Sequence, residues 1–222
     1  GNYGMDYEGS DVDTKCVIVP TIKQLAAEEK TSRTHIRYND EHIDFKDLRL
    51  YCATFKKQNL NFLEILFSPY DIVNPLYKSE WDRLVAAREE ITHYDPKRAV
   101  MSMMGLARTK YKQLEHESPS HEKDIERFGY SPKELCHLYR IEEYLERYIA
   151  GEPYADCLVS KRAGYLKGVK AGNWGIDDVR WMAKASIDRI EAMCAKFAAT
   201  CNKVDEEVGK LLDDVQYNMM KI

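Results

Sequence analysis

Strand-forming patterns are confined to the N-terminal part of this chain, and this limits its fold more than any other feature of the sequence. Residues 11–19 are rich in β-branched side chains and stop at Pro20, as a largely buried strand does. Residues 34–45 contain two strand-like segments on either side of the turn pair Asn39-Asp40, which predicts a hairpin. The sequence therefore predicts an α+β fold, with a small mixed β-sheet at the N-terminal end and a helical C-terminal region.

The rest of the chain carries punctuation that is typical of helices. A short helix is expected within residues 21–33. Three later helix starts are marked by a capping side chain directly before proline: Asn74-Pro75, Asp95-Pro96 and Ser131-Pro132. Glu134 lies three residues after Ser131, which predicts a capping box. The helix that starts there is predicted to end at Gly151, because glycine favours the left-handed terminus of a helix.

Apolar residues near the C-terminus recur with alternating spacings of four and three. They are Ala183, Ile187, Ile190, Cys194, Phe197, Cys201, Val204, Val208, Leu211 and Val215. This heptad pattern predicts one long helix, weakened only at Gly209. Two interpretations remain open, because such a helix either packs along the helical part of its own chain or pairs with a second copy in a homo-oligomer.

Composition excludes several classes of protein. The chain has 33 basic and 37 acidic residues and a formal charge of −4, so a broad basic surface for polyanions is excluded and any nucleic-acid contact must be local. Membrane spans of roughly 18 apolar residues and a signal peptide are not found, which predicts a cytoplasmic protein with no membrane partner. The six cysteines form no C-x-x-C pair, so we expect buried, reduced thiols rather than a zinc site.

Two acids open the first predicted strand. Asp11 and Asp13 are two residues apart, and residues i and i+2 of a strand project from the same face. Two carboxylates so close raise one another's pKa unless a divalent cation lies between them, and Mg²⁺ favours carboxylate and phosphate oxygens. The pair therefore indicates a magnesium site, although such pairs also serve as turn or capping acids.

A third acid lies on the other predicted strand. Asp44 shares a face with His42, opposite Ile43 and Phe45. If this strand lies beside the first, three carboxylates converge, and three acids can hold two metal ions about 4 Å apart. Such a pair of ions activates an attacking oxygen and stabilises a leaving pyrophosphate. The alternative is that Asp44 caps the following helix.

A basic stripe lies on the helix that begins at Pro132. Lys133, His137 and Arg140 are spaced four and three residues apart, next to a face of leucine and isoleucine. Such a stripe can face a triphosphate, because arginine chelates phosphate oxygens and lysine supplies a point charge. The alternative is a solvated face in which Glu134 and Glu143 are the ion-pair partners.

Three stretches of the chain together resemble one enzyme family. They are Tyr3-Gly4 with Ser10-Asp11 and Asp13, an N-x-L-E-x-L-F element in residues 61–67, and a K-x-x-x-H-x-x-R helix in residues 133–140. In this order they are similar to the nucleotidyltransferases of the DNA polymerase β superfamily, in particular to the predicted nucleotidyltransferases of bacteria and phages that are associated with RNA repair. The resemblance covers about residues 1–195.

The resemblance implies transfer of a nucleoside monophosphate from a nucleoside triphosphate (NTP) to an acceptor, either an RNA such as tRNA or a protein. It implies Asp11 and Asp13 as ligands of Mg²⁺ or Mn²⁺, and Asp44 as the third carboxylate, which would also help to deprotonate the acceptor hydroxyl. The nucleotide-binding residues would include Lys133, His137 and Arg140.

Further candidates for contact with the nucleotide follow from the same motifs. Ser10 adjoins the acids, and Tyr3 offers a ring for stacking on a base. Asn61 and Glu64, one helical turn apart, either contact the nucleotide or pair structurally. The family's Gly-Ser pair, which cradles triphosphate oxygens, would lie upstream of Gly1.

The predicted organisation has three parts. Residues 1–70 would form the catalytic core, residues 71–195 a helical region that closes the cleft, and residues 196–222 a helical tail. Two functional alternatives remain open. One is a non-catalytic nucleotide-binding or oligomeric interaction protein, and the other is a toxin that acts by nucleotidyl transfer.

Overall fold

The computed structural model describes residues 13–38, 41–119 and 121–221, which fold into two compact units. We call residues 97–202 the helical unit. Residues 13–96 together with 203–221 form the second unit, which we call the sheet unit. Each unit has its own core, so each is described by itself.

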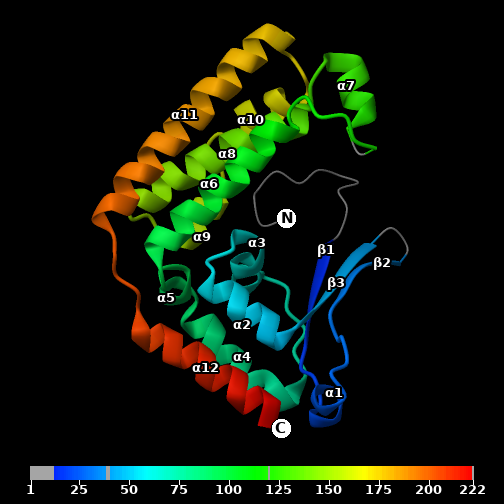
Figure 1. The fold of residues 1–222 in the computed structure, drawn as a ribbon, viewed down its shortest axis with the longest axis vertical. Coiled ribbons are helices and arrows are strands. Elements are labelled where there is room, and N and C mark those ends of the chain that lie inside the picture. Colours follow the sequence, from blue (N-terminus) through cyan, green and yellow to red (C-terminus); the bar gives the residue numbers. More distant parts are fainter. Residues whose placement is uncertain (1–12, 39–40, 120, 222) are drawn as a thin grey trace. The chain divides into compact units, whose positions relative to one another are not determined.

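The sheet unit contains a three-stranded mixed sheet with the order β1-β3-β2 (Figure 1). Its strands are β1 (Asp13–Ile18), β2 (Arg33–Tyr38) and β3 (Glu41–Asp47). β1 and β3 run parallel, whereas β2 and β3 form the predicted antiparallel hairpin. The α+β class and the small mixed sheet are therefore confirmed. Between β1 and β2 lies the short helix α1 (Ile22–Ala26), which begins with a capping box of Thr21 and Gln24.

Helices that follow the sheet complete the core of this unit. They are α2 (Leu48–Lys56), α3 (Leu60–Leu63), the 3₁₀ segments η1 (Glu64–Phe67) and η2 (Pro75–Tyr77), α4 (Lys78–Ala86) and α5 (Arg88–Thr92). α2 begins directly after β3, where the Asp47 side chain accepts a hydrogen bond of 2.8 Å from the backbone N–H of Arg49. Asp47 is therefore the cap of α2, and Asp44 stays within the strand.

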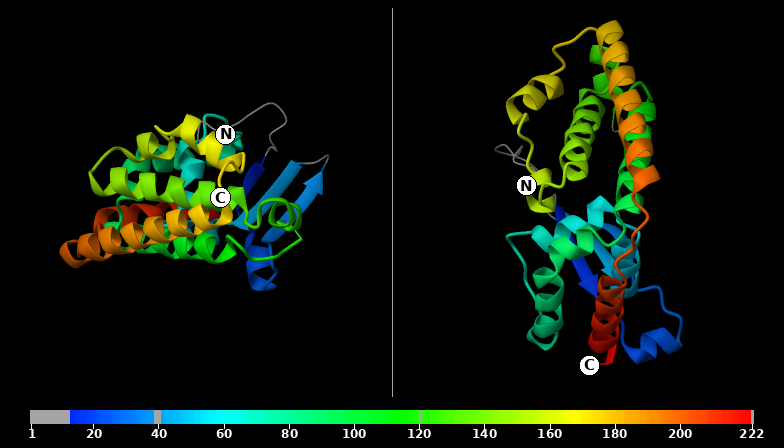
Figure 2. Two further views of the ribbon diagram at one scale, coloured as in Figure 1. Left: turned by 90° about the horizontal axis from the view of Figure 1, so that it is seen from above. Right: turned by 90° about the vertical axis from the view of Figure 1, so that its left-hand side faces the viewer.

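The helical unit is built around one central helix. Its elements are α6 (Pro96–Gln113), α7 (Glu122–Phe128), α8 (Pro132–Ile149), α9 (Tyr154–Leu158), α10 (Ala163–Lys170) and α11 (Ile176–Thr200). α8 packs against α10 and α11 (Figure 2). The predicted apolar face of α8 is buried: Leu135, Leu138, Ile141 and Leu145 are at most 4% exposed.

The helix boundaries that proline and glycine predicted are confirmed, with one exception in the capping. η2, α6 and α8 begin at Pro75, Pro96 and Pro132. α8 is followed by Gly151 with φ +83°, the left-handed conformation expected there. The capping box is wrong, because the Ser131 side chain makes no capping hydrogen bond.

Glu134 interacts with two basic side chains instead of with the start of α8. Its carboxylate lies 3.0 Å from Lys110 Nζ and 3.3 Å from His121 Nε2. It is 2% exposed, and burial favours partners that bring charge or a ring N–H. Tertiary partners therefore replace the local capping interaction.

The single C-terminal helix predicted from the heptad pattern is wrong. α11 ends at Thr200, Cys201 is extended, and a new helix, α12 (Glu206–Lys221), begins after Asp205. Asp205 Oδ1 accepts from the backbone N–H groups of Glu207 and Val208, at 3.1 and 3.2 Å. This is an N-terminal cap, and it is the signal in the sequence that the heptad interpretation passed over.

The apolar stripe is divided between the two cores. Ala183 and Ile187 on α11 are buried in the helical unit, whereas Val208 and Val215 on α12 are buried in the sheet unit. α12 packs on α2 and α4 (Figure 1). The predicted weak point, Gly209, faces Tyr94, and a Cβ atom there would lie 3.3 Å from the Tyr94 ring. Pairing with a second copy in a homo-oligomer, one of the two interpretations of this stripe, stays a prediction. The continuous helix from which it was argued is divided into α11 and α12.

The predicted division into residues 1–70, 71–195 and 196–222 stays a prediction; α12, within the last of these ranges, belongs to the sheet unit. Four of the six cysteines are buried, namely Cys52, Cys136, Cys157 and Cys194. Within the described ranges, every helix is too short or too polar to cross a membrane.

Candidate functional site

The register between β1 and β3 brings two of the predicted acid positions onto adjacent strands. Asp13 pairs with His42, and Lys15 pairs with Asp44. Asp13 and Asp44 are therefore offset by two residues along the same face of two paired strands. Their Cα atoms are about 8 Å apart, given a strand spacing of about 4.8 Å and a rise of about 3.3 Å per residue. The parallel pairing therefore puts these two positions on neighbouring strands, and the convergence of the carboxylates themselves stays a prediction.

Asp44 forms an ion pair within its own strand. Its Oδ1 atom lies 3.1 Å from Lys46 Nζ, two residues further along β3 and on the same face. This oxygen is buried and accepts no hydrogen bond from the described residues. The Asp44 side chain is 27% exposed overall. Among the described residues, the carboxylate is therefore paired with one cation, and its buried oxygen can still accept a hydrogen bond or a ligand.

Lys15 connects β1 with the segment that follows α2. Its ammonium donates to the Glu64 carboxylate and to the backbone carbonyl of Asn61. The Lys15 side chain is 27% exposed and that of Glu64 is 12% exposed. Lys15 also lies directly across from Asp44 in the parallel register. The Asn61–Glu64 motif is thus tied to the row of charged residues on the sheet.

Local structure explains why the motif reaches the sheet. Asn59 caps α3, because its side chain accepts a hydrogen bond of 3.1 Å from the backbone N–H of Asn61. Leu60, Leu63 and Leu66 are buried and anchor the segment in the core. Since these leucines point inward, Glu64 lies at the junction of α3 and η1 with its carboxylate toward Lys15.

The Tyr51 hydroxyl lies near both of these acids. Tyr51 is 1% exposed, and its hydroxyl has no hydrogen-bond partner among the described residues. Burial raises the pKa of this hydroxyl, and the charges of Asp44, Cys16 and Glu64 raise it further. The charges of Asp44 and Glu64 therefore both raise the pKa of the same buried tyrosine hydroxyl.

Several predicted site residues cannot be placed. Tyr3, Ser10 and Asp11 lie outside the described residues, and for Asp13 the backbone alone is described. Across the described side chains, no group of three or more His, Cys, Asp or Glu residues is arranged to hold a metal ion.

A cluster of basic side chains surrounds His137 in the helical unit. His137 is half-buried on α8, and four cations act on it: Arg140, Lys110, Lys133 and Lys170. They come from α6, α8 and α10. We call these five residues the basic cluster. The structure thus keeps the predicted stripe of Lys133, His137 and Arg140 together and adds a lysine from each of two neighbouring helices.

The surroundings of His137 hold it in the neutral form. Burial lowers its pKa most, and the four cations lower it further, to about 3. A neutral imidazole offers one N–H donor and one acceptor. An anion that entered the cluster would offset the repulsion that the cations exert on a protonated His137. The site is therefore suited to a ligand with several negative charges.

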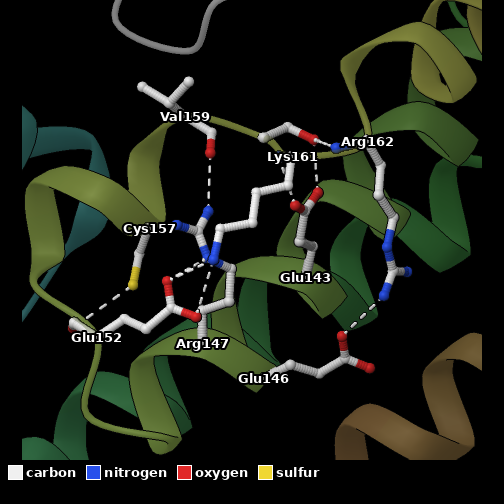
Figure 3. Close-up of polar contacts among 9 residues, drawn as sticks. Glu143, Glu146, Arg147, Glu152, Cys157, Val159, Lys161 and Arg162 are labelled. Carbon is white, nitrogen blue, oxygen red and sulfur yellow. Dashed lines mark hydrogen bonds and ion pairs between the residues drawn. The ribbon is translucent and has the colours of Figure 1, made fainter.

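Glu134 and Glu143 are the two acids that the sequence offers as ion-pair partners of this stripe, and Glu134 pairs with one cation of the basic cluster, Lys110. Glu134 binds Lys110 and His121. Glu143 accepts from the Ser160 hydroxyl at 2.5 Å and from the Lys161 backbone N–H at 2.7 Å (Figure 3). Glu143 is therefore part of a polar network that fastens α8 to the loop before α10.

The same network contains an arginine that joins three segments. Arg147 donates to the Glu152 carboxylate and to the Val159 carbonyl, both at 2.8 Å, and Lys161 also binds Glu152 (Figure 3). Arg147 is 8% exposed. These contacts are structural, because the partners are backbone groups or side chains of the same network.

Sequence reasoning missed four charged residues at these sites: Lys15, Lys46, Lys110 and Lys170. For the first two a signal was present, because each lies two residues after an acid in a strand, and alternation places such residues on one face. The other two are supplied by helices whose packing on α8 is a tertiary feature.

Comparison with known proteins identifies no relative. No known family, curated protein or solved structure matches this chain. The resemblance to nucleotidyltransferases therefore stays a prediction from the motifs.

Proposed function

We propose that this protein is a metal-dependent nucleotidyltransferase of the DNA polymerase β type, which transfers a nucleoside monophosphate from an NTP to an acceptor. The observation that carries the proposal is the parallel register of β1 and β3. It puts the Asp13 and Asp44 positions on neighbouring strands with an offset of two residues. Placement of Asp44 at a helix cap would have removed the third carboxylate. The cap of α2 is Asp47 instead.

The donor set fits a hard divalent cation. Asp44 Oδ1 is a buried carboxylate oxygen that accepts no hydrogen bond from the described residues, and Mg²⁺ and Mn²⁺ favour carboxylate oxygens as ligands. Asp11, Asp13 and Asp44 would hold the ions. When bound, the ions would neutralise polyphosphate charge and activate the attacking oxygen. Release of Asp44 from Lys46 would free its carboxylate both to bind the ion and to accept a proton from the acceptor hydroxyl.

The basic cluster would supply contacts to phosphate groups of a substrate. Arg140 can bind phosphate oxygens through two N–H groups, and Lys133 provides a point charge. Neutral His137 would donate one hydrogen bond. These roles follow from the concentration of cations from three helices around one half-buried imidazole.

The decisive experiment measures transfer and binding on the full chain. We expect a radiolabelled nucleotide from one of the four NTPs to appear on RNA or protein in the presence of Mg²⁺, and Asp13→Asn or Asp44→Asn to abolish the labelling. An absence of transfer with every NTP, together with unchanged NTP binding in both variants, would refute the proposal.

A second candidate is a nucleotide-binding protein without transfer activity. One observation favours it: the two described acids near the site, Asp44 and Glu64, are both paired with lysines, so their charge is already neutralised. This candidate predicts NTP binding by calorimetry with no turnover. It also predicts that Asp44→Asn leaves NTP affinity unchanged.

A further inference from the structure

Lys15 occupies a position that the proposed chemistry does not yet use. It lies two residues after Asp13 in β1 and opposite Asp44 in β3. All three positions are on one face of the sheet, because strand residues alternate and paired residues of parallel strands face the same way. The positively charged Lys15 is therefore a neighbour of two acidic positions on this face, Asp13 and Asp44.

The Lys15 ammonium is held in place by two acceptors. It donates to the Asn61 carbonyl and to Glu64, both on the anchored segment after α2. An ammonium has three donors, so these contacts leave one. Among the described residues its acceptors are Glu64 and the Asn61 carbonyl, and the side chain is 27% exposed, so a ligand can reach the third donor.

We propose that Lys15 binds the polyphosphate of the nucleotide through its third donor, and that Glu64 and the Asn61 carbonyl position its ammonium for this contact. The inference rests on the proposed function, because it assumes that the polyphosphate lies along the face that carries Asp13 and Asp44. Under this assignment, Glu64 is a positioning residue that acts through Lys15. This explains why a carboxylate lies so close to a site for an anionic ligand.

Lys46 differs from Lys15 in a way that supports the assignment. Lys46 has its Nζ 3.1 Å from Asp44, and its side chain is 13% exposed. Its positive charge is thus directed at a proposed metal ligand, whereas that of Lys15 is directed away from Asp44 by Glu64. Lys15 can therefore stay in place when a cation binds Asp44, whereas Lys46 must give way.

The test compares Lys15→Met with Lys23→Met, which removes the same charge from an exposed position on α1 of the same unit. Tripolyphosphate with Mn²⁺ is titrated by calorimetry into each variant. The wild-type chain is titrated in the same way and gives the reference affinity, because the basic cluster is then the same in all three chains. We expect Lys15→Met to weaken binding about 10- to 100-fold, as for a lost hydrogen bond between charged groups, and Lys23→Met to change it less than about twofold.

Two further measurements separate the inference from the function on which it rests. Glu64→Gln should weaken tripolyphosphate binding several-fold while Mn²⁺ affinity is unchanged. If Lys15→Met lowers the melting temperature but leaves tripolyphosphate affinity unchanged, Lys15 is a structural staple and the inference is wrong. The inference is also wrong if the wild-type chain does not bind tripolyphosphate. Nucleotide transfer by the wild-type chain is assayed separately, and labelling there would keep the proposed function.

Discussion

The carboxylates of α8 and those beside the sheet differ in the partners that hold them. Glu142 and Glu143 are 2% and 4% exposed, and each accepts a hydrogen bond from a buried hydroxyl group, that of Ser186 and that of Ser160 respectively. Asp44 is 27% exposed in its side chain and is held by one lysine. A carboxylate whose oxygens accept hydrogen bonds from buried hydroxyl groups belongs to the framework. Asp44 Oδ1 accepts no hydrogen bond from the described residues, so this carboxylate can exchange its lysine for a ligand.

The difference has an energetic basis. Removing one partner from a buried, hydrogen-bonded charge typically costs about 3–5 kcal/mol, because the other group stays buried without compensation. A partly exposed lysine–carboxylate pair contributes roughly 0–1 kcal/mol. Substitution in the two regions should therefore separate loss of stability from loss of function.

The largest effect is expected for activity at Asp44. Asp44→Asn should reduce nucleotide transfer about 10³-fold, because several kcal/mol of transition-state charge stabilisation would be lost with the metal ligand. The melting temperature should change little. Asp214→Asn, an exposed position on α12, is the matched control. A fall in stability without a fall in transfer would place Asp44 with the framework carboxylates.

The next effect is expected for stability at Glu143. Glu143→Ala should lower the free energy of unfolding by about 2–3 kcal/mol, because the Ser160 hydroxyl and the Lys161 N–H lose their charged acceptor. Denaturant unfolding measures this change. Glu146→Ala, which removes an exposed ion pair with Arg162, should change stability by less than about 1 kcal/mol. Equal losses of stability in the two variants would contradict the distinction between buried framework carboxylates and exposed ones.

Acid should destabilise the fold through His137. Its folded pKa of about 3 lies below the ordinary value of 6.5, so the unfolded chain binds one more proton between these values. Stability contributed by the neutral form is thus present above about pH 6.5 and is lost as the pH falls toward 3. His137→Gln should reduce this pH dependence in thermal unfolding, whereas the exposed His116→Gln should not. An unchanged profile in His137→Gln would contradict the burial of a neutral imidazole.

The smallest effect is expected at Lys46. Lys46→Met should raise Mn²⁺ affinity about two- to fivefold, since the ammonium that competes for Asp44 is worth at most about 1 kcal/mol. Free Mn²⁺ measured by electron paramagnetic resonance gives the affinity. Lower affinity in this variant would mean that the lysine supports the site rather than competing for it.

Local signals predicted the start and stop points of elements well. Pro96 and Pro132 begin their helices and Gly151 follows α8, because these residues restrict or release the backbone regardless of their surroundings. The capping box at Ser131 failed, because Glu134 has better partners in Lys110 and His121. Interactions that a distant residue can outcompete are the ones that local patterns mispredict.

The candidate site was predictable in part for the same reason. Asp44 was placed on a strand face from alternation alone, and the hairpin that carries it is confirmed. The position of Glu64 was not predictable, because its partner Lys15 lies on β1 and the two meet only through the packing of the segment after α2. The heptad pattern identified buried positions such as Ala183 and Val215, but Val204 in its middle is exposed, and the pattern could not say that α11 and α12 enter different cores.

By itself, the sequence determined where backbone elements begin and end and which face of each is apolar, since these depend on steric and hydrophobic properties of neighbouring residues. Tertiary structure decided which charges meet. It set Lys15 opposite Asp44, gathered cations from three helices around His137, and divided the C-terminal stripe between two cores. The physical reason is that charges and buried surfaces select partners by distance in space, and that distance is set only when the chain packs.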